Sequence, residues 1–220
     1  MRHGFILLCI LTISHVGLTD CNNEPGTNII SPPQDSVTCI DSNRNVYPVV
    51  KIGNQYWMSE NLRVTHTAEG NLLSGVYIYN NNDDVNVSIY GRLYTWQTAL
   101  DACPEGWHLP TYTEWQILFD FLGGRNIAGG ALKETGTEHW DNPNVGATNS
   151  AGFNARGSGF RGPDGNYYSQ KQHCDFWGVT NNSADPYSVY LYNNSSQVIS
   201  ESNIDDRTSG IAFSVRYIKN

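Results

Sequence analysis

The sequence predicts a loop-rich fold that mixes short helices with strands, and three observations carry this prediction. Glycine is frequent (21 residues) and charged residues are scarce (15%), a composition that favours loops and strands over long exposed helices. The stretch 111–123 carries start and stop signals of a helix, and the stretch 46–58 carries the signals of a β-hairpin. With 220 residues, of which 39% are hydrophobic, the chain can bury a core.

Residues 1–20 have the pattern of a secretion signal. Arg2 precedes an apolar run that is too short to span a bilayer as a stable helix. Segments of this kind are removed from the mature protein. We therefore expect the first twenty residues to be a signal peptide.

The end of this segment, Leu18-Thr19-Asp20-Cys21, is similar to a bacterial lipobox, in which the signal is cut before a cysteine that carries lipid. Asp20 departs from the small residue that is usual there, so ordinary secretion is the alternative. Residues 21–36 are polar and contain several prolines, which is typical of a flexible tether. We expect Cys21 to be lipidated and residues 37–220 to form one folded domain held off an outer membrane.

Three cysteines remain if Cys9 is lost with the signal and Cys21 carries lipid. They are Cys39, Cys103 and Cys174. An odd number allows at most one disulfide within the chain, and the spacing leaves its pairing open. The spacing fits no zinc-binding pattern.

The first half of the domain contains a predicted hairpin and a predicted helix. Two β-rich runs flank the turn at Gly53-Asn54 within residues 46–58. Residues 64–90 are rich in Asn and turn-forming residues, and we expect a long surface excursion there. Apolar residues at helical spacing then predict a short helix over residues 91–102. They are Leu93, Trp96, Ala99 and Leu100.

A second predicted helix has signals at both ends. Thr111 and Glu114 stand at the spacing of a capping box, in which each side chain binds the backbone amide of the other residue. Gly123 supplies the left-handed stop. One apolar stripe lies between them, and its members are Trp115, Leu118, Phe119 and Leu122.

The last third alternates short aromatic anchors with runs rich in Asn, Ser, Tyr and Asp. Within residues 188–193, Tyr190 and Tyr192 alternate with apolar residues, so the two tyrosines should share one face of a strand. The stretch 211–218 alternates in the same way. Its predicted apolar face contains Phe213, Val215 and Tyr217.

Several motifs in a fixed order give the chain a family resemblance. They are Val49-Val-Lys-Ile-Gly53, Trp57-Met-Ser-Glu-Asn-Leu62, Gly91-Arg-Leu-Tyr94, Cys103-Pro-Glu-Gly-Trp-His-Leu-Pro-Thr111, Phe176-Trp177 and Phe213-Ser-Val-Arg216. Together they resemble the Fibrobacter succinogenes major paralogous domain over residues 37–220. The resemblance implies a C-type-lectin-like fold, a compact α+β domain with two short helices and a small twisted antiparallel sheet.

One position departs from the pattern of this family. Relatives commonly end in Ser-Val-Arg-Cys, whereas Tyr217 stands here in place of that cysteine. If Cys103 pairs with it in relatives, the resemblance implies that this bridge is missing. Cys103 is then free, or paired with Cys39 or Cys174.

The polar and aromatic residues of the last third are the candidate ligand-binding surface. Tyrosine gives a large contact area at small entropic cost, and Ser, Asn and Gly give adaptable hydrogen bonds. The resemblance adds that some relatives are diversified binding proteins that vary positions in this region. We expect one exposed patch, made of Tyr168, Gln170, His173, Asp175, Tyr187, Tyr190, Tyr192 and Asn194. The alternative is a set of generic polar loops.

The sequence gives little support to a metal site, a cofactor site or a catalytic site. His108 has no second His or Cys at ligand spacing, and Trp140-Asp141-Asn142 lacks the companion triplet of calcium-dependent lectins. The chain has no nucleophile elbow, zinc-protease motif or P-loop. We therefore expect no metal, no cofactor and no catalytic residue. A concave pocket with convergent titratable groups would instead favour an enzyme.

The sequence thus predicts a protein of the bacterial outer membrane or cell surface, lipid-anchored or alternatively secreted, that binds a glycan or a surface protein. Its net charge of −8 without a Lys/Arg cluster argues against nucleic acid. The membrane would be reached through the N-terminal lipid only. The alternatives are a structural or assembly subunit of a surface appendage, where the patch is a fixed interface, and a secreted hydrolase.

Overall fold

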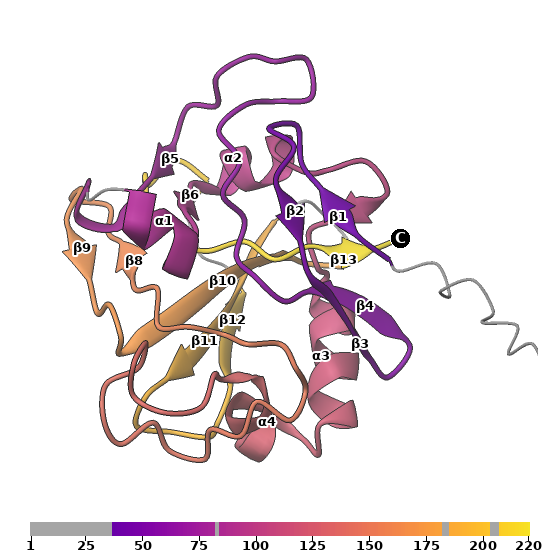
Figure 1. Cartoon of the computed structure of the whole chain (residues 1–220), viewed down its shortest axis with the longest axis vertical. Coiled ribbons are helices and arrows are strands. Elements are labelled where there is room, and N and C mark those ends of the chain that lie inside the picture. The colour runs from indigo at the N-terminus through magenta and orange to yellow at the C-terminus, as the bar shows by residue number, and fades with distance from the viewer. Residues whose placement is uncertain (1–36, 82–83, 182–184, 203–206) are drawn as a thin grey trace, which may run out of the picture. The chain divides into compact units, whose positions relative to one another are not determined.

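The computed structural model describes residues 37–81, 84–181, 185–202 and 207–220 (Figure 1). The expected signal peptide, the expected lipid at Cys21 and the tether up to residue 36 lie outside the described residues. Within the described part, no helix combines the length and apolar character needed to cross a membrane.

The fold is α+β, with short helices and several small antiparallel sheets (Figure 1). The helices are α1 (Asp84–Tyr90), α2 (Trp96–Asp101), α3 (Tyr112–Phe121) and α4 (Arg125–Leu132), with a 3-10 turn η1 (Tyr79–Asn81). A three-stranded sheet has the order β10 (His173–Val179), β11 (Pro186–Tyr192), β12 (Ile199–Ser202). A four-stranded sheet has the order β3 (Val49–Ile52), β4 (Gln55–Met58), β13 (Ile218–Lys219), β7 (Trp107–His108). Three strand pairs are β1 (Cys39–Ile40) with β2 (Val46–Tyr47), β5 (Val76–Tyr77) with β6 (Leu93–Tyr94), and β8 (Phe160–Arg161) with β9 (Tyr167–Tyr168).

The predicted hairpin and the predicted capped helix are both confirmed. Strands β3 and β4 pair antiparallel across Gly53, whose φ of 59° lies in the left-handed region that favours glycine. Helix α3 begins after Thr111, whose Oγ1 accepts from the Glu114 amide at 3.2 Å while Glu114 Oε2 accepts from the Thr111 amide at 2.8 Å. The other Glu114 oxygen lies 2.7 Å from His108 Nε2, so His108 is held as a structural histidine.

The helix predicted over residues 91–102 is wrong in its first half. Leu93 lies in β6, because Tyr94 pairs with β5 and with the C-terminal segment at Phe213, and only Trp96–Asp101 is helical. The expected excursion over residues 64–90 is wrong in part, because it contains β5, η1 and α1.

Helix α4 was missed because Gly129 and Gly130 weaken its helical pattern. The structure gives the reason for these glycines. A Cβ on Gly129 would stand 2.7 Å from the Ser196 carbonyl oxygen, so only glycine allows this close approach of helix and loop.

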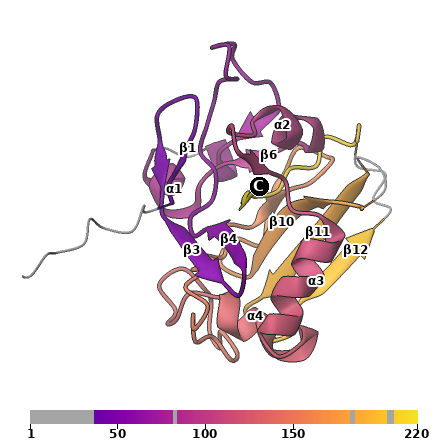
Figure 2. The ribbon, with the colours of Figure 1, turned by 90° about the vertical axis from the view of Figure 1, so that its right-hand side faces the viewer.

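The three-stranded sheet separates two hydrophobic clusters. Against one face lie α3 and α4, with Trp115, Leu118 and Phe119 packed on Phe176 and Val189 (Figure 2). The second cluster collects α2, Trp177 and the C-terminal residues Phe213, Val215 and Tyr217. The predicted apolar face of residues 211–218 is therefore confirmed, although Ser214 and Arg216 on its other side are buried too. Both clusters belong to one compact unit, Val37–Asn220.

All three cysteines of the described residues are free thiols: Cys39, Cys103 and Cys174. Cys39 and Cys103 belong to the second cluster, as does Tyr217. The Tyr217 hydroxyl donates to the Ala99 carbonyl at 2.7 Å. This hydrogen bond ties the C-terminal segment to α2. It is made at position 217, where the family resemblance implies a cysteine in relatives.

Candidate functional site

A cavity of about 230 Å³ lies on one face of the β10–β11 pair. In the strand register His173 is opposite Tyr192, and Asp175 is opposite Tyr190. Directly opposite residues of an antiparallel pair share a face, so these four side chains project together. Three further side chains complete the walls, and we call the whole the aromatic cavity. The added residues are Phe160, Ile211 and Phe213.

The rings of the aromatic cavity brace one another. The centroids of the Tyr192 and His173 rings lie 4.3 Å apart, edge to face. Phe160 stacks on His173 at 6.2 Å, and Phe213 meets Phe160 at 6.1 Å and Tyr190 at 6.0 Å. Contacts of this geometry fix ring orientations and add to the stabilisation from burial. The cavity is therefore preformed by packing.

Asp175 is the chemically distinctive group of the aromatic cavity. Only 2% of the residue is exposed, and among the described residues no donor lies within hydrogen-bond distance of its buried Oδ1. His173 Nδ1 is 3.9 Å away, beyond hydrogen-bond distance. A buried polar atom without a partner costs about 1–3 kcal/mol, a cost that a bound hydrogen-bond donor would remove.

The electrostatics of the aromatic cavity follow from burial. Burial raises the pKa of Asp175 well above its ordinary value and lowers the pKa of His173. Burial also raises the pKa of Tyr192, with smaller contributions from the charges of Asp175 and Glu201. At neutral pH His173 and Tyr192 are uncharged, and the empty cavity favours the protonated form of Asp175.

Two of the eight residues predicted as an exposed patch are buried, and this corrects the prediction. Asp175 is enclosed by the cavity walls, and Tyr187 is 2% exposed on the opposite face of the sheet. The Tyr187 ring packs 5.3 Å from the Tyr112 ring on α3, and its hydroxyl accepts from Arg125 Nη2 at 3.3 Å. The physical reason is strand parity, because Tyr187 and Tyr190 are an odd number of residues apart.

Four of the eight line the aromatic cavity, as described above, and three more lie outside its lining. Tyr168 is 40% exposed and stacks 5.4 Å from Phe160, so it borders the cavity. Gln170 is half-buried, and its backbone N–H donates to the Tyr79 hydroxyl at 3.3 Å. Asn194 is exposed just after β11.

Sequence reasoning missed the walls Phe160, Ile211 and Phe213 as site residues. Alternation predicts an apolar strand face that contains Phe213, and Phe160 is one of the short aromatic segments of the last third. Neither signal shows which apolar residues leave a hollow between them. That information comes only from the way β8 and the C-terminal segment cross the sheet.

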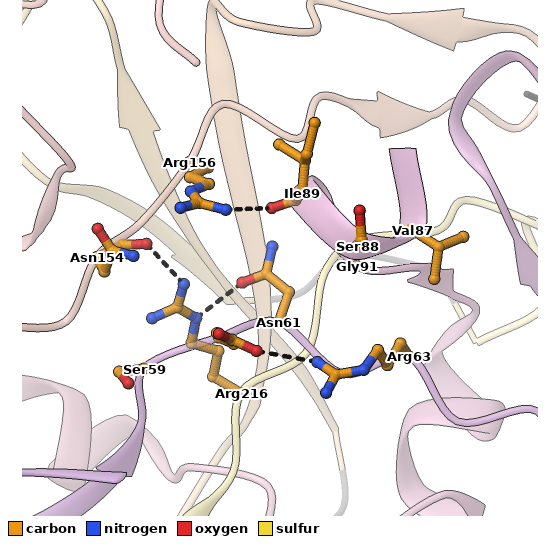
Figure 3. A pocket seen from close by; sticks show the side chains of 11 residues that line it. Ser59, Asn61, Arg63, Val87, Ser88, Ile89, Gly91, Asn154, Arg156 and Arg216 are labelled. Atoms are coloured by element: carbon orange, nitrogen blue, oxygen red, sulfur yellow. Dashed lines mark hydrogen bonds and ion pairs between the residues drawn. The ribbon is translucent and has the colours of Figure 1, made fainter. Parts of the chain in front are cut away.

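A crevice lined by three arginines is a structural feature and not a ligand site (Figure 3). Arg63, Arg156 and Arg216 approach it, yet its volume of about 10 Å³ holds no more than one water molecule. Arg216 is already satisfied there by Asn61 Oδ1 at 2.7 Å and the Asn154 carbonyl at 3.0 Å (Figure 3).

A further hollow of about 210 Å³ lies beside Cys103. Burial raises the pKa of the Cys103 thiol to about 12, so the thiol stays protonated at neutral pH. Because the thiolate is the reactive form, this cysteine is a poor nucleophile. The hollow therefore offers no covalent chemistry of its own.

The aromatic cavity meets in part the condition set above for an enzyme, since titratable side chains converge in it. Among the described residues that line it, however, none is Ser, Thr or Cys, and His173 does not hydrogen-bond Asp175. Nowhere in residues 37–81, 84–181, 185–202 and 207–220 do three His, Cys, Asp or Glu side chains come together as metal ligands would.

A family model described as the Fibrobacter succinogenes major domain (Fib_succ_major) matches residues 50–219. The matched range includes every residue of the aromatic cavity. No curated protein and no solved structure matches the chain.

Proposed function

The chain belongs to the Fibrobacter succinogenes major domain family, and we propose that this member is a cell-surface binding protein that holds a glycan or a surface protein at the aromatic cavity. In this proposal no residue is catalytic and no metal or cofactor takes part. The lipid at Cys21 would anchor the protein to the outer membrane, with secretion as the alternative. The frame would be a C-type-lectin-like fold.

The observation that carries the proposal is the unpartnered Asp175 oxygen beneath aromatic rings. Binding sites are mostly apolar hollows with a few polar groups that fix the orientation of the ligand. The aromatic cavity has this composition, with Tyr190 and Tyr192 half-buried at its side. A ligand that reaches Asp175 would supply the hydrogen bond that its Oδ1 lacks and would cover the Tyr190 and Tyr192 rings.

The test is a screen of glycans and surface proteins with the purified protein, repeated after Tyr190→Ala with Tyr192→Ala. We expect the double substitution to weaken binding by at least about tenfold, because buried aromatic anchors carry most of the energy of an interface. The affinity is measured by biolayer interferometry for each ligand that the wild-type protein retains.

Tyr112→Ala is the matched control, since Tyr112 is 41% exposed on α3, away from the aromatic cavity. It should bind as the wild type does. Unchanged binding by the double variant would remove the aromatic cavity from the proposed function.

The second candidate is an assembly subunit of a surface appendage, and a different surface favours it. Ile117, Phe121 and Ile127 on α3 and α4 are 50%, 62% and 56% exposed. Neighbouring exposed apolar side chains are typical of protein interfaces. Sedimentation velocity separates the two functions, because a binder of free targets stays monomeric, whereas a subunit associates as its concentration rises.

A further inference from the structure

We propose that the group received by the aromatic cavity is the protonated amine of a lysine side chain on a protein partner, which donates to Asp175. This inference rests on the proposed function, since it specifies which ligand chemistry that site takes. It follows from the charge of Asp175 and from the apolar and aromatic walls of the cavity.

Asp175 has no counter-ion of its own. Among the described residues, the one basic group near its carboxyl is His173, at 3.9 Å, and the cavity lining contains no Lys or Arg. Buried carboxylates are ordinarily paired or hydrogen-bonded. An ammonium group supplies both missing elements, because it brings a positive charge and three N–H donors to the free Oδ1.

The walls of the aromatic cavity suit both the ammonium group and the methylene groups of a lysine side chain. Phe160, Tyr190 and Tyr192 present aromatic rings, and the negative face of such a ring attracts an ammonium group within about 6 Å of its centroid. Ile211 and Phe213 add apolar surface along which methylene groups can pack.

The chemistry of the walls favours a slender group over a sugar ring. A sugar ring buries several hydroxyl groups that need partners, and the Phe160, Ile211 and Phe213 walls offer none. A four-carbon stem with one terminal charge has no such requirement.

The rim of the cavity adds negative charge. At the rim Glu201 on β12 lies 3.5 Å from the Tyr190 hydroxyl, and the whole chain carries a net charge of −8. A field of this sign draws a basic partner toward the cavity.

The inference predicts a definite pH dependence. The ammonium group pairs with the ionised form of Asp175, whose pKa burial raises in the empty cavity. The affinity should therefore rise with pH, by up to about tenfold per unit, until that pKa is passed. The other titratable groups at the cavity are His173 on the same strand, whose pKa burial lowers, and Tyr190, Tyr192 and Glu201 on the neighbouring strands.

The experiment compares n-butylammonium with 1-butanol, two probes of equal length that differ in charge, by NMR titration of the whole protein between pH 6 and 8. Glucosamine and glucose form a second pair, which tests an amino sugar as the source of the amine. Asp175→Asn removes the charge at nearly constant shape, and Asp120→Asn, at an exposed site on α3, is the control.

We expect n-butylammonium to bind at least about tenfold more tightly than 1-butanol at pH 8, with the His173 and Tyr192 ring signals shifting. Asp175→Asn should abolish the difference and its pH dependence, and Asp120→Asn should keep both. Equal binding of the two butyl probes by the wild-type protein would overturn the inference. This comparison does not depend on the folding of any variant. Tighter binding of glucosamine than of n-butylammonium would contradict the proposal that the amine belongs to a lysine side chain.

The experiments distinguish failure of the ammonium inference from failure of the proposed binding function. If the butyl probes bind alike while the double tyrosine substitution still abolishes binding in the screen, the ammonium inference is wrong and the cavity remains the binding site. If the double substitution leaves binding intact, the proposed function is wrong.

Discussion

Replacing Arg216 by Met should lower the free energy of unfolding by about 4 kcal/mol, because the substitution removes the donors of a buried hydrogen-bond cluster. The guanidinium donates to the carbonyls of Met58, Phe153 and Asn154 and to Asn61 Oδ1. Its centre lies 4.3 Å from the Phe153 ring centroid. Met keeps much of the aliphatic volume and leaves these oxygens buried without donors.

Urea unfolding at pH 7 measures this loss. Burial lowers the pKa of Arg216 to about 9, so the guanidinium is still charged at pH 7. Arg63→Met is the matched control, because Arg63 borders the same crevice (Figure 3) and pairs with the half-exposed Glu60. A surface pair of this kind contributes about 0–1 kcal/mol. Similar losses for the two variants would contradict the structural role given to Arg216.

Replacing Lys133 by Met should cost about 3 kcal/mol of stability and also weaken ligand binding. The fully buried Lys133 Nζ donates to the carbonyls of Val145, Tyr192 and Ser195 at 2.8–2.9 Å. It thereby ties α4 to the loops that follow it and to the end of β11. Since Tyr192 ends β11 and lines the aromatic cavity, losing this tie should displace the ring that contacts the ligand.

Unfolding and binding are measured on the same samples at pH 7, where Lys133 is mostly charged because burial lowers its pKa only to about 8. Lys51→Met is the control, since Lys51 is exposed on β3 beside Tyr56. That change should shift stability by less than about 0.5 kcal/mol. A destabilised Lys133→Met that binds with full affinity would show that the cavity does not depend on this tie.

The parts of the fold that could be predicted are those fixed by local chemistry. The Thr111–Glu114 capping box acts within one turn of helix, and the β3–β4 hairpin needs only a short turn at Gly53. Helix α4 could not be predicted, because Gly129 allows a close approach to Ser196 and Gly130 one to Gly146, and both contacts lie outside the helix. Leu93 likewise follows its strand partners rather than its helical spacing.

The candidate site was predicted in part for the same reason. Alternation placed Tyr190 and Tyr192 on one face, and the structure has them there. The same parity should have excluded Tyr187 from that face. The burial of Asp175 has no sequence signal, because it depends on Phe213 and Ile211 crossing above the sheet. Arg216 and Lys133 look like surface residues in the sequence, and only the folded chain surrounds them with carbonyls.

Tyrosine nitration footprinting tests the central claim, that ligands are held at the aromatic cavity, most directly. The protein is nitrated with and without a ligand retained in the screen, and modified tyrosines are located by mass spectrometry. The cavity site predicts that the ligand protects Tyr190 and Tyr192 and leaves Tyr112 on α3 as reactive as before. Protection of Tyr112 with unchanged reactivity of Tyr190 and Tyr192 would contradict it.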